Sequence, residues 1–177
     1  MNLFTEFDPK LIKKDDFVTI IEITKGSKNK YELDKQTGAL RLDRILHTAT
    51  HYPGNYGFIP CTYADDGDPL DVLLLASEPI LPLTEVHSRP IGVLKMIDQG
   101  DIDEKIIAIC QEDPFYNSFE TISELPTHIL EEIKYFFETY KVLENKPTSV
   151  TSIESRHEAI KIIQKCIDAF KIKYVNK

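Results

Sequence analysis

Four carboxylates lie within seven residues near the middle of the chain, at residues 65–71 (DDGDPLD). Like charges packed this closely repel one another and raise each other's pKa. A hard divalent cation that takes oxygen ligands removes that cost. Gly67 permits a tight turn and Pro69 stiffens it. The pattern therefore favours a cation site over an ordinary solvated acidic loop.

A short apolar run, residues 72–76 (VLLLA), follows this acidic turn directly. It is bounded by turn residues and is too apolar for an exposed loop, so it predicts a buried strand that holds the turn in place. The calcium loop of helix–loop–helix proteins does not fit, because it needs Gly at its sixth position and Glu at its twelfth. Counted from Asp65, the Gly falls third and the twelfth residue is Ala76.

A second acidic segment, residues 98–105 (DQGDIDEK), joins two further strand-like runs at 89–97 and 106–110. By itself it predicts a hairpin turn. Two acidic turns, each attached to a buried strand, could also converge on one cluster of cations. Lys105 would then lie beside that cluster.

The strand-like runs 30–34 and 40–45 carry basic side chains that could contact phosphate. Lys30 and Glu32 share one face of a strand, where they are either a weak surface pair or a phosphate contact beside a metal ligand. Arg44 continues the apolar face of its own run, and its planar guanidinium suits bidentate phosphate contacts.

Other polar groups are equally open. Glu22 is the one charged residue of the strand-like run 17–23, so it faces either solvent or a polar site. Tyr52 and Tyr56 flank a Pro-Gly-Asn turn, where they either plug one end of a barrel or donate to phosphate oxygens. A third candidate pair, Tyr140-Lys141, ends an apolar helical stripe that opens at Pro126.

The order of elements predicts the fold class. Five or more short strands with turn signals precede two helices, of which the second opens with a Ser155–Glu158 capping box. We expect an α+β, mainly β fold: a small closed antiparallel five-stranded barrel with two flanking helices. No repeat or linker interrupts the chain, so residues 1–177 are expected to form a single domain.

Composition excludes several classes of function. The 177 residues carry a net charge of −8, which disfavours a general binder of nucleic acid or of anionic membranes. No apolar run approaches the ~20 residues that span a bilayer. The three cysteines are far apart, which suits a reducing compartment, so we expect a cytoplasmic location.

Seven segments resemble the soluble inorganic pyrophosphatases of the bacterial hexameric type (family I). The segment 66–72 (DGDPLDV) resembles the signature loop of that family. The other similar segments, in chain order, are Glu22, Lys30-Tyr31-Glu32, Asp43-Arg44, Tyr52-Pro53-Gly54-Asn55-Tyr56-Gly57, Asp98 to Lys105 and Tyr140-Lys141.

The resemblance implies magnesium-dependent hydrolysis of pyrophosphate to two phosphates, by attack of a hydroxide that bridges metal ions. It implies an oligonucleotide-binding-like barrel, several Mg²⁺ in each active site, and assembly as a homohexamer. Asp68 would be the catalytic base. The implied metal ligands are Glu32, Asp66, Asp71, Asp98 and Asp103. The implied substrate contacts are Lys30, Arg44, Tyr56, Lys105, Tyr140 and Lys141.

The chain departs from the family pattern at a few positions. Gln99 stands where many members have Glu, Thr24 where many have Pro, and residues 146–148 (KPT) replace the usual Lys-Trp. Two other classes of function remain possible: a calcium-binding module without catalysis, and a barrel that binds single-stranded nucleic acid. The second needs a basic, aromatic groove, which a net charge of −8 and the lack of Trp disfavour.

Overall fold

Nine strands and two α-helices make up residues 2–175, the part of the chain that the computed structural model describes. The strands are β1 (Ile12–Lys13), β2 (Asp16–Ile23), β3 (Asn29–Leu33), β4 (Leu40–Ile45), β5 (Asn55–Phe58), β6 (Asp71–Leu75), β7 (Glu85–Asp98), β8 (Asp101–Cys110) and β9 (Thr148–Ser155). The helices are α1 (Thr127–Thr139) and α2 (Arg156–Phe170), with short helical turns η1 (Pro9–Leu11), η2 (Ile122–Glu124), η3 (Val142–Glu144) and η4 (Lys171–Val175).

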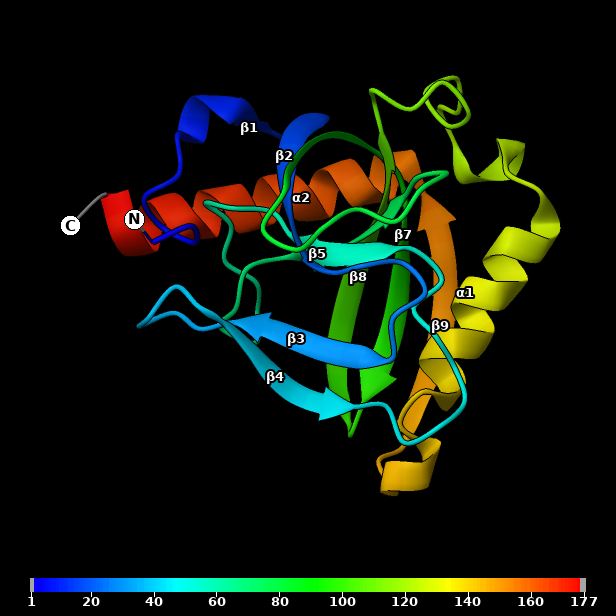
Figure 1. Ribbon diagram of the computed structural model, residues 1–177. Coiled ribbons are helices and arrows are strands. Elements are labelled where there is room, and N and C mark those ends of the chain that lie inside the picture. Colours follow the sequence, from blue (N-terminus) through cyan, green and yellow to red (C-terminus); the bar gives the residue numbers. More distant parts are fainter. Residues whose placement is uncertain (1, 176–177) are drawn as a thin grey trace.

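Five strands close into a ring in the order β2-β5-β6-β8-β7, and β7 pairs again with β2. This confirms the predicted mainly β fold with two flanking helices. Four of the five pairings are antiparallel, whereas β6 and β8 run parallel. The β3–β4 hairpin forms a separate two-stranded sheet, and the two α-helices lie along different sides of the ring (Figure 1).

Strand β6 is buried on both of its faces, as its apolar run predicts. Val72 and Leu74 belong to the core that also contains the apolar face of α2. Leu73 and Leu75 point the other way, into the core shared with α1. Successive side chains of β6 thus pack into two different hydrophobic clusters. This packing holds in place the strand that follows the first acidic turn.

The apolar stripe predicted for the first helix packs against one of these cores, and an apolar face of α2 packs against the other. Buried residues on these faces include Ile133, Phe136, Phe137 and Tyr140 in the first case and Ile163, Ile167 and Phe170 in the second. Ile160 is only half-buried. At the start of α2 the Ser155 hydroxyl accepts from the Glu158 amide at 3.5 Å, while the Glu158 carboxylate binds Lys95 instead of completing the capping box.

Strand β5 was not predicted, because its residues are also turn formers. Gly57 is required there: a Cβ at this position would lie 1.8 Å from the Ile20 carbonyl oxygen of β2. Asn55 is fully buried, and its side-chain oxygen accepts from the Lys25 and Ile80 amides at 3.0 and 2.9 Å. Tertiary contacts therefore place Asn55–Phe58, directly after Pro53-Gly54, as a strand of the ring.

The second acidic segment is a hairpin turn between β7 and β8, as expected. Its two central residues, Gln99 and Gly100, have positive φ of 51° and 92°. Such a turn matches the twist of the flanking strands and brings Asp98 opposite Asp101. Among residues 2–175, no helix is both long and apolar enough to cross a membrane.

Candidate active site

A pocket of about 350 Å³ opens at the ends of the ring strands that carry the acidic turns. Eleven of the twelve side chains that the sequence nominated line this pocket: Lys30, Glu32, Tyr56, Asp66, Asp68, Asp71, Asp98, Asp103, Lys105, Tyr140 and Lys141. They come from β3, β5, the first acidic turn, β6, β7, β8 and the end of α1. The fold therefore gathers into one cavity residues that lie more than a hundred positions apart, from Lys30 to Lys141.

Backbone hydrogen bonds hold the first acidic turn in a tight conformation. The Ala64 amide donates to the Asp68 carbonyl at 2.8 Å, and the Gly67 amide donates to the Ala64 carbonyl at 3.0 Å. Gly67 adopts a φ of 86°, which favours glycine. The Asp66 carboxylate accepts from the Asp68 amide at 2.9 Å, so the backbone of the turn orients the Asp66 side chain.

Lys105 lies at the floor of the pocket and is almost completely buried. Its Nζ is 3.1 Å from Asp71, 3.0 Å from Asp103 and 2.7 Å from the Tyr56 hydroxyl, which itself donates to Asp71 at 2.8 Å. Burial works against the charged ammonium, but Tyr56 and the two carboxylates raise the pKa of Lys105 well above its usual value. The lysine therefore stays protonated.

The carboxylates of the pocket raise one another's pKa. Burial raises the pKa of Asp71, and Asp103 adds to the effect while Lys105 opposes it. Burial also raises the pKa of Asp66, helped by the negative charges of Asp71, Asp68 and Asp103, against a hydrogen bond from the Asp68 amide. Both acids would gain from a further positive charge placed in the cavity.

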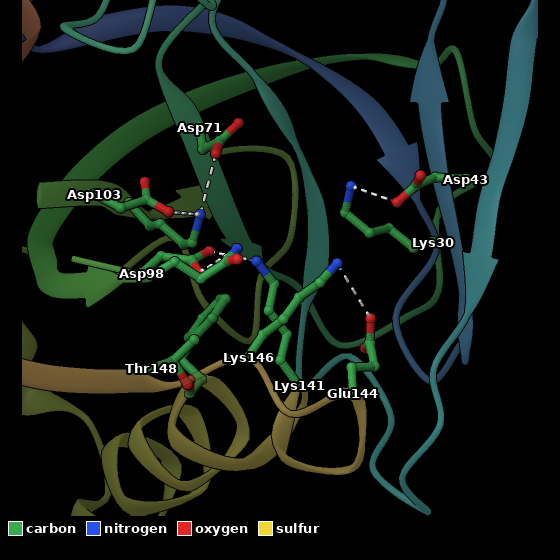
Figure 2. A network of polar contacts seen from close by, with 12 residues as sticks. Lys30, Asp43, Asp71, Asp98, Asp103, Lys141, Glu144, Lys146 and Thr148 are labelled. Carbon is green, nitrogen blue, oxygen red and sulfur yellow. Dashed lines mark hydrogen bonds and ion pairs between the residues drawn. The ribbon is translucent and has the colours of Figure 1, made fainter. Parts of the chain in front are cut away.

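Two other lysines of the pocket also pair with carboxylates (Figure 2). Lys141 pairs with Asp98, and Lys30 pairs with Asp43 at 3.2 Å and with Glu32. These ammonium groups supply the positive charge that the acidic side chains need. In the part of the chain that the structure describes, no three carboxylate, imidazole or thiol groups converge as ligands of one ion.

Arg44 is the one nominated residue that does not line the pocket. It sits on β4 opposite Lys30 of β3. Its guanidinium contacts Asp43 of the same strand, and its Nε lies 2.8 Å from the Glu144 carboxylate of η3. Both Nε and Nη2 are buried without a hydrogen-bond partner among the described residues, and whereas Nε faces Glu144 in the ion pair, the N–H groups of Nη2 remain unsatisfied.

Four further polar residues line the pocket: Glu22 and Tyr52, whose roles the sequence left open, and Tyr31 and Lys35, which it did not nominate. Glu22 was weighed as either solvent-facing or site-facing, and the structure buries it facing the pocket. Lys35 was not singled out, because it lies in a polar turn after β3. It pairs with Asp68 across the mouth of the pocket, a contact that no local sequence signal indicates.

The donor groups suit a hard cation. Seven carboxylates line the pocket, and none of the described lining residues is His or Cys. Magnesium and calcium prefer such oxygen ligands, whereas zinc and copper favour imidazole or thiolate. Asp66 and Asp71 have raised pKa values, and the charge of Asp103 contributes to both shifts.

The chain is similar to known proteins of one family. The inorganic pyrophosphatase family profile matches residues 19–171. Soluble inorganic pyrophosphatase 3 of Arabidopsis thaliana is 54% identical over 147 residues, which are 81% of this chain and 68% of that protein. Soluble inorganic pyrophosphatase 1 of the same plant is 49% identical over 154 residues, 87% of this chain and 73% of that protein.

Solved structures of inorganic pyrophosphatases share the fold. The Thermus thermophilus enzyme is 40% identical with a TM-score of 0.91, covering 97% of this chain and 99% of its own. The Helicobacter pylori enzyme is 44% identical with a TM-score of 0.87, covering 90% and 95%. The chain therefore belongs to the inorganic pyrophosphatase family. This makes it an inorganic diphosphatase, a hydrolase that acts on a phosphoanhydride bond.

Burial of Glu22 makes the stability of the metal-free protein depend on pH. Desolvation raises its pKa from 4.5 to about 8, although the Leu33 amide donates to its Oε1 at 2.8 Å. The folded protein then holds this proton more tightly than the unfolded chain, so the free energy of unfolding falls as pH rises from about 5 to about 8. Linkage puts that loss on the order of 3 kcal/mol.

Glu22→Gln should remove this loss, because the neutral amide still accepts from Leu33 and has no proton to lose. Urea unfolding in chelator at pH 5 and pH 8 measures the effect. The variant should lose much less stability than wild type over this range. An equal loss in both proteins would show that other groups cause the pH dependence.

Proposed function

We propose that this chain hydrolyses inorganic pyrophosphate to two phosphates and requires Mg²⁺ to do so. The observation that carries this proposal is a single pocket in which oxygen-only metal ligands face several lysines. Carboxylates alone would suit a calcium-binding module. Carboxylates together with Lys30, Lys105 and Lys141 suit a substrate that brings its own phosphates and its own cations.

Charge supports a role for metal ions. Seven carboxylates and four lysines line the pocket, so even with Glu22 protonated its formal charge is negative. Pyrophosphate is itself a polyanion and would be repelled by this pocket alone. Divalent cations that bind Asp66, Asp71 and Asp103 reverse the local charge. Glu32 and Asp98 would bind the cations that arrive with the substrate.

Bound Mg²⁺ would neutralise charge on the reacting phosphates and lower the pKa of a water ligand towards neutrality. The protein must then position that water and accept its proton. Asp68 is our candidate for this role, because it lies in the acidic turn between two proposed ligands and about half of its side chain is exposed at the mouth of the pocket. Its partner Lys35 is equally exposed, so water reaches the pair.

Cationic and hydroxyl groups on the other side of the pocket would bind the phosphates. Lys30 and Lys141 are free to exchange their carboxylate partners for phosphate oxygens. Burial raises the pKa of Tyr56 and of Tyr140, so both hydroxyls remain protonated donors. We propose that Arg44 stabilises the departing phosphate from its place beside the pocket, using the unsatisfied Nη2.

We also propose that residues 1–177 act as one domain in a cytoplasmic homohexamer. Support for assembly comes from large apolar side chains exposed on the single chain, among them Leu81, Ile102 and Phe115. Light scattering after size-exclusion chromatography tests the assembly, and a monomer at micromolar concentration would contradict it.

Purified protein should release phosphate from pyrophosphate with Mg²⁺ and should stop when a chelator is in excess. Calcium should bind the same carboxylates yet support little turnover, because its looser shell at ~2.3–2.6 Å replaces the tight octahedron of Mg²⁺ at ~2.0–2.1 Å. A shift of even ~1 Å in the attacking water can cost ~10²-fold in rate. A phosphate-release assay with each metal measures this. Full activity in chelator, or equal rates with both metals, would contradict the proposal.

Asp68→Asn should lower turnover by roughly 10²-fold or more, as loss of a general base does, while the protein stays folded. The matched control is Asp65→Asn, a carboxylate of the same turn that is largely exposed, pairs with Lys165 and does not line the pocket. The control should turn over near the wild-type rate. Equal rates for both variants would remove Asp68 from the reaction.

A further inference from the structure

A buried hydroxyl joins the two ends of the first acidic turn. At the base of the turn, β5 and β6 pair as far as Phe58 and Asp71. The next residues towards the turn are Ile59 and Leu70, which form only one of the two backbone hydrogen bonds that a strand pair could make. The Ile59 amide donates to the Leu70 carbonyl at 3.0 Å. The reciprocal backbone bond is replaced by a side chain.

Thr62 fills that place. Its Oγ1 accepts from the Leu70 amide at 2.9 Å and donates to the Ile59 carbonyl at 2.6 Å. The hydroxyl thus bridges a donor and an acceptor that would otherwise bond directly. Thr62 is 3% exposed, and Ile59 and Leu70 are fully buried. Water cannot readily replace the hydroxyl, so its loss would leave two buried backbone groups without partners.

The position of this bridge gives it a consequence for the pocket. Leu70 immediately precedes Asp71, which is on the strand, whereas Asp66 and Asp68 are on the turn that the bridge closes. The distance between the two ends of the turn therefore sets how the turn carboxylates lie relative to Asp71. We propose that Thr62 is a positioning residue: it holds Asp66 and Asp68 at the distance from Asp71 that a divalent cation needs. This inference rests on the proposed function.

The direct test is the affinity for Mg²⁺, measured by isothermal titration calorimetry without substrate. Thr62→Val keeps the shape of the side chain and removes the hydroxyl, so it should weaken Mg²⁺ binding by about 10- to 100-fold, the range for groups that orient metal ligands. Thr62→Ser keeps the hydroxyl and should bind as wild type does. The Mg²⁺ concentration for half-maximal phosphate release should shift in parallel.

Thr19→Val is the matched control. Thr19 is also fully buried, and its hydroxyl donates to Ser88 at 2.8 Å in the wall of the ring between β2 and β7, away from the pocket. It should lower stability without changing Mg²⁺ affinity. If Thr62→Val does not fold, Thr62→Ala takes its place. Hydrogen exchange at the Leu70 amide should be slow in wild type and fast in either hydroxyl-free variant.

Each failure has a separate meaning. Wild-type affinity in the hydroxyl-free variant would overturn the role of Thr62, and so would an equal loss in Thr19→Val, since the effect would then be a general loosening of the ring. A wild-type protein that binds no Mg²⁺ would contradict the proposed function itself.

Discussion

The ion pair between Lys105 and Asp71 is the interaction on which the rest of the structure depends. A buried ammonium costs several kcal/mol unless carboxylates and hydrogen bonds compensate it. The parallel register of β6 and β8 supplies that compensation by placing Asp71 directly opposite Lys105. The same pairing completes the ring of strands. The strand pair that closes the ring therefore also forms the pocket floor. The Nζ of Lys105 lies 5.3 Å from the ring centroid of Tyr56 and 5.5 Å from that of Phe137.

The negative and positive charges of the pocket come mostly from different parts of the fold. Most of the carboxylates of the pocket stand on ring strands or on the turns between them. Three of the four lysines come from outside the ring: Lys30 and Lys35 from β3 and the turn after it, and Lys141 from the end of α1. Without metal these lysines neutralise the acids. In the proposed function, cations bound to the acids would release the same lysines to bind phosphate, so one pocket would serve both kinds of ligand.

Sequence patterns predicted the elements whose residues are consistent along the chain. The run 72–76 was identifiable as a buried strand because both of its faces are apolar, and the apolar stripe that ends at Tyr140-Lys141 indicated where α1 meets the pocket. Strand β5 was missed because the burial of Asn55 and the close approach of β2 to Gly57 are tertiary effects. Lys35 was missed for the same reason, since its partner Asp68 is 33 positions away.

We propose that divalent cations bind between Asp66, Asp71 and Asp103 and add to the charge of Lys105 there. The most direct measurement is a crystal structure with Mn²⁺, whose anomalous scattering locates each ion independently of the refined protein. We expect anomalous peaks inside the pocket, bounded by Asp66, Asp71 and Asp103, with carboxylate oxygens as ligands. An active protein whose pocket shows no peak at saturating Mn²⁺, or whose ions all lie elsewhere, would contradict the account.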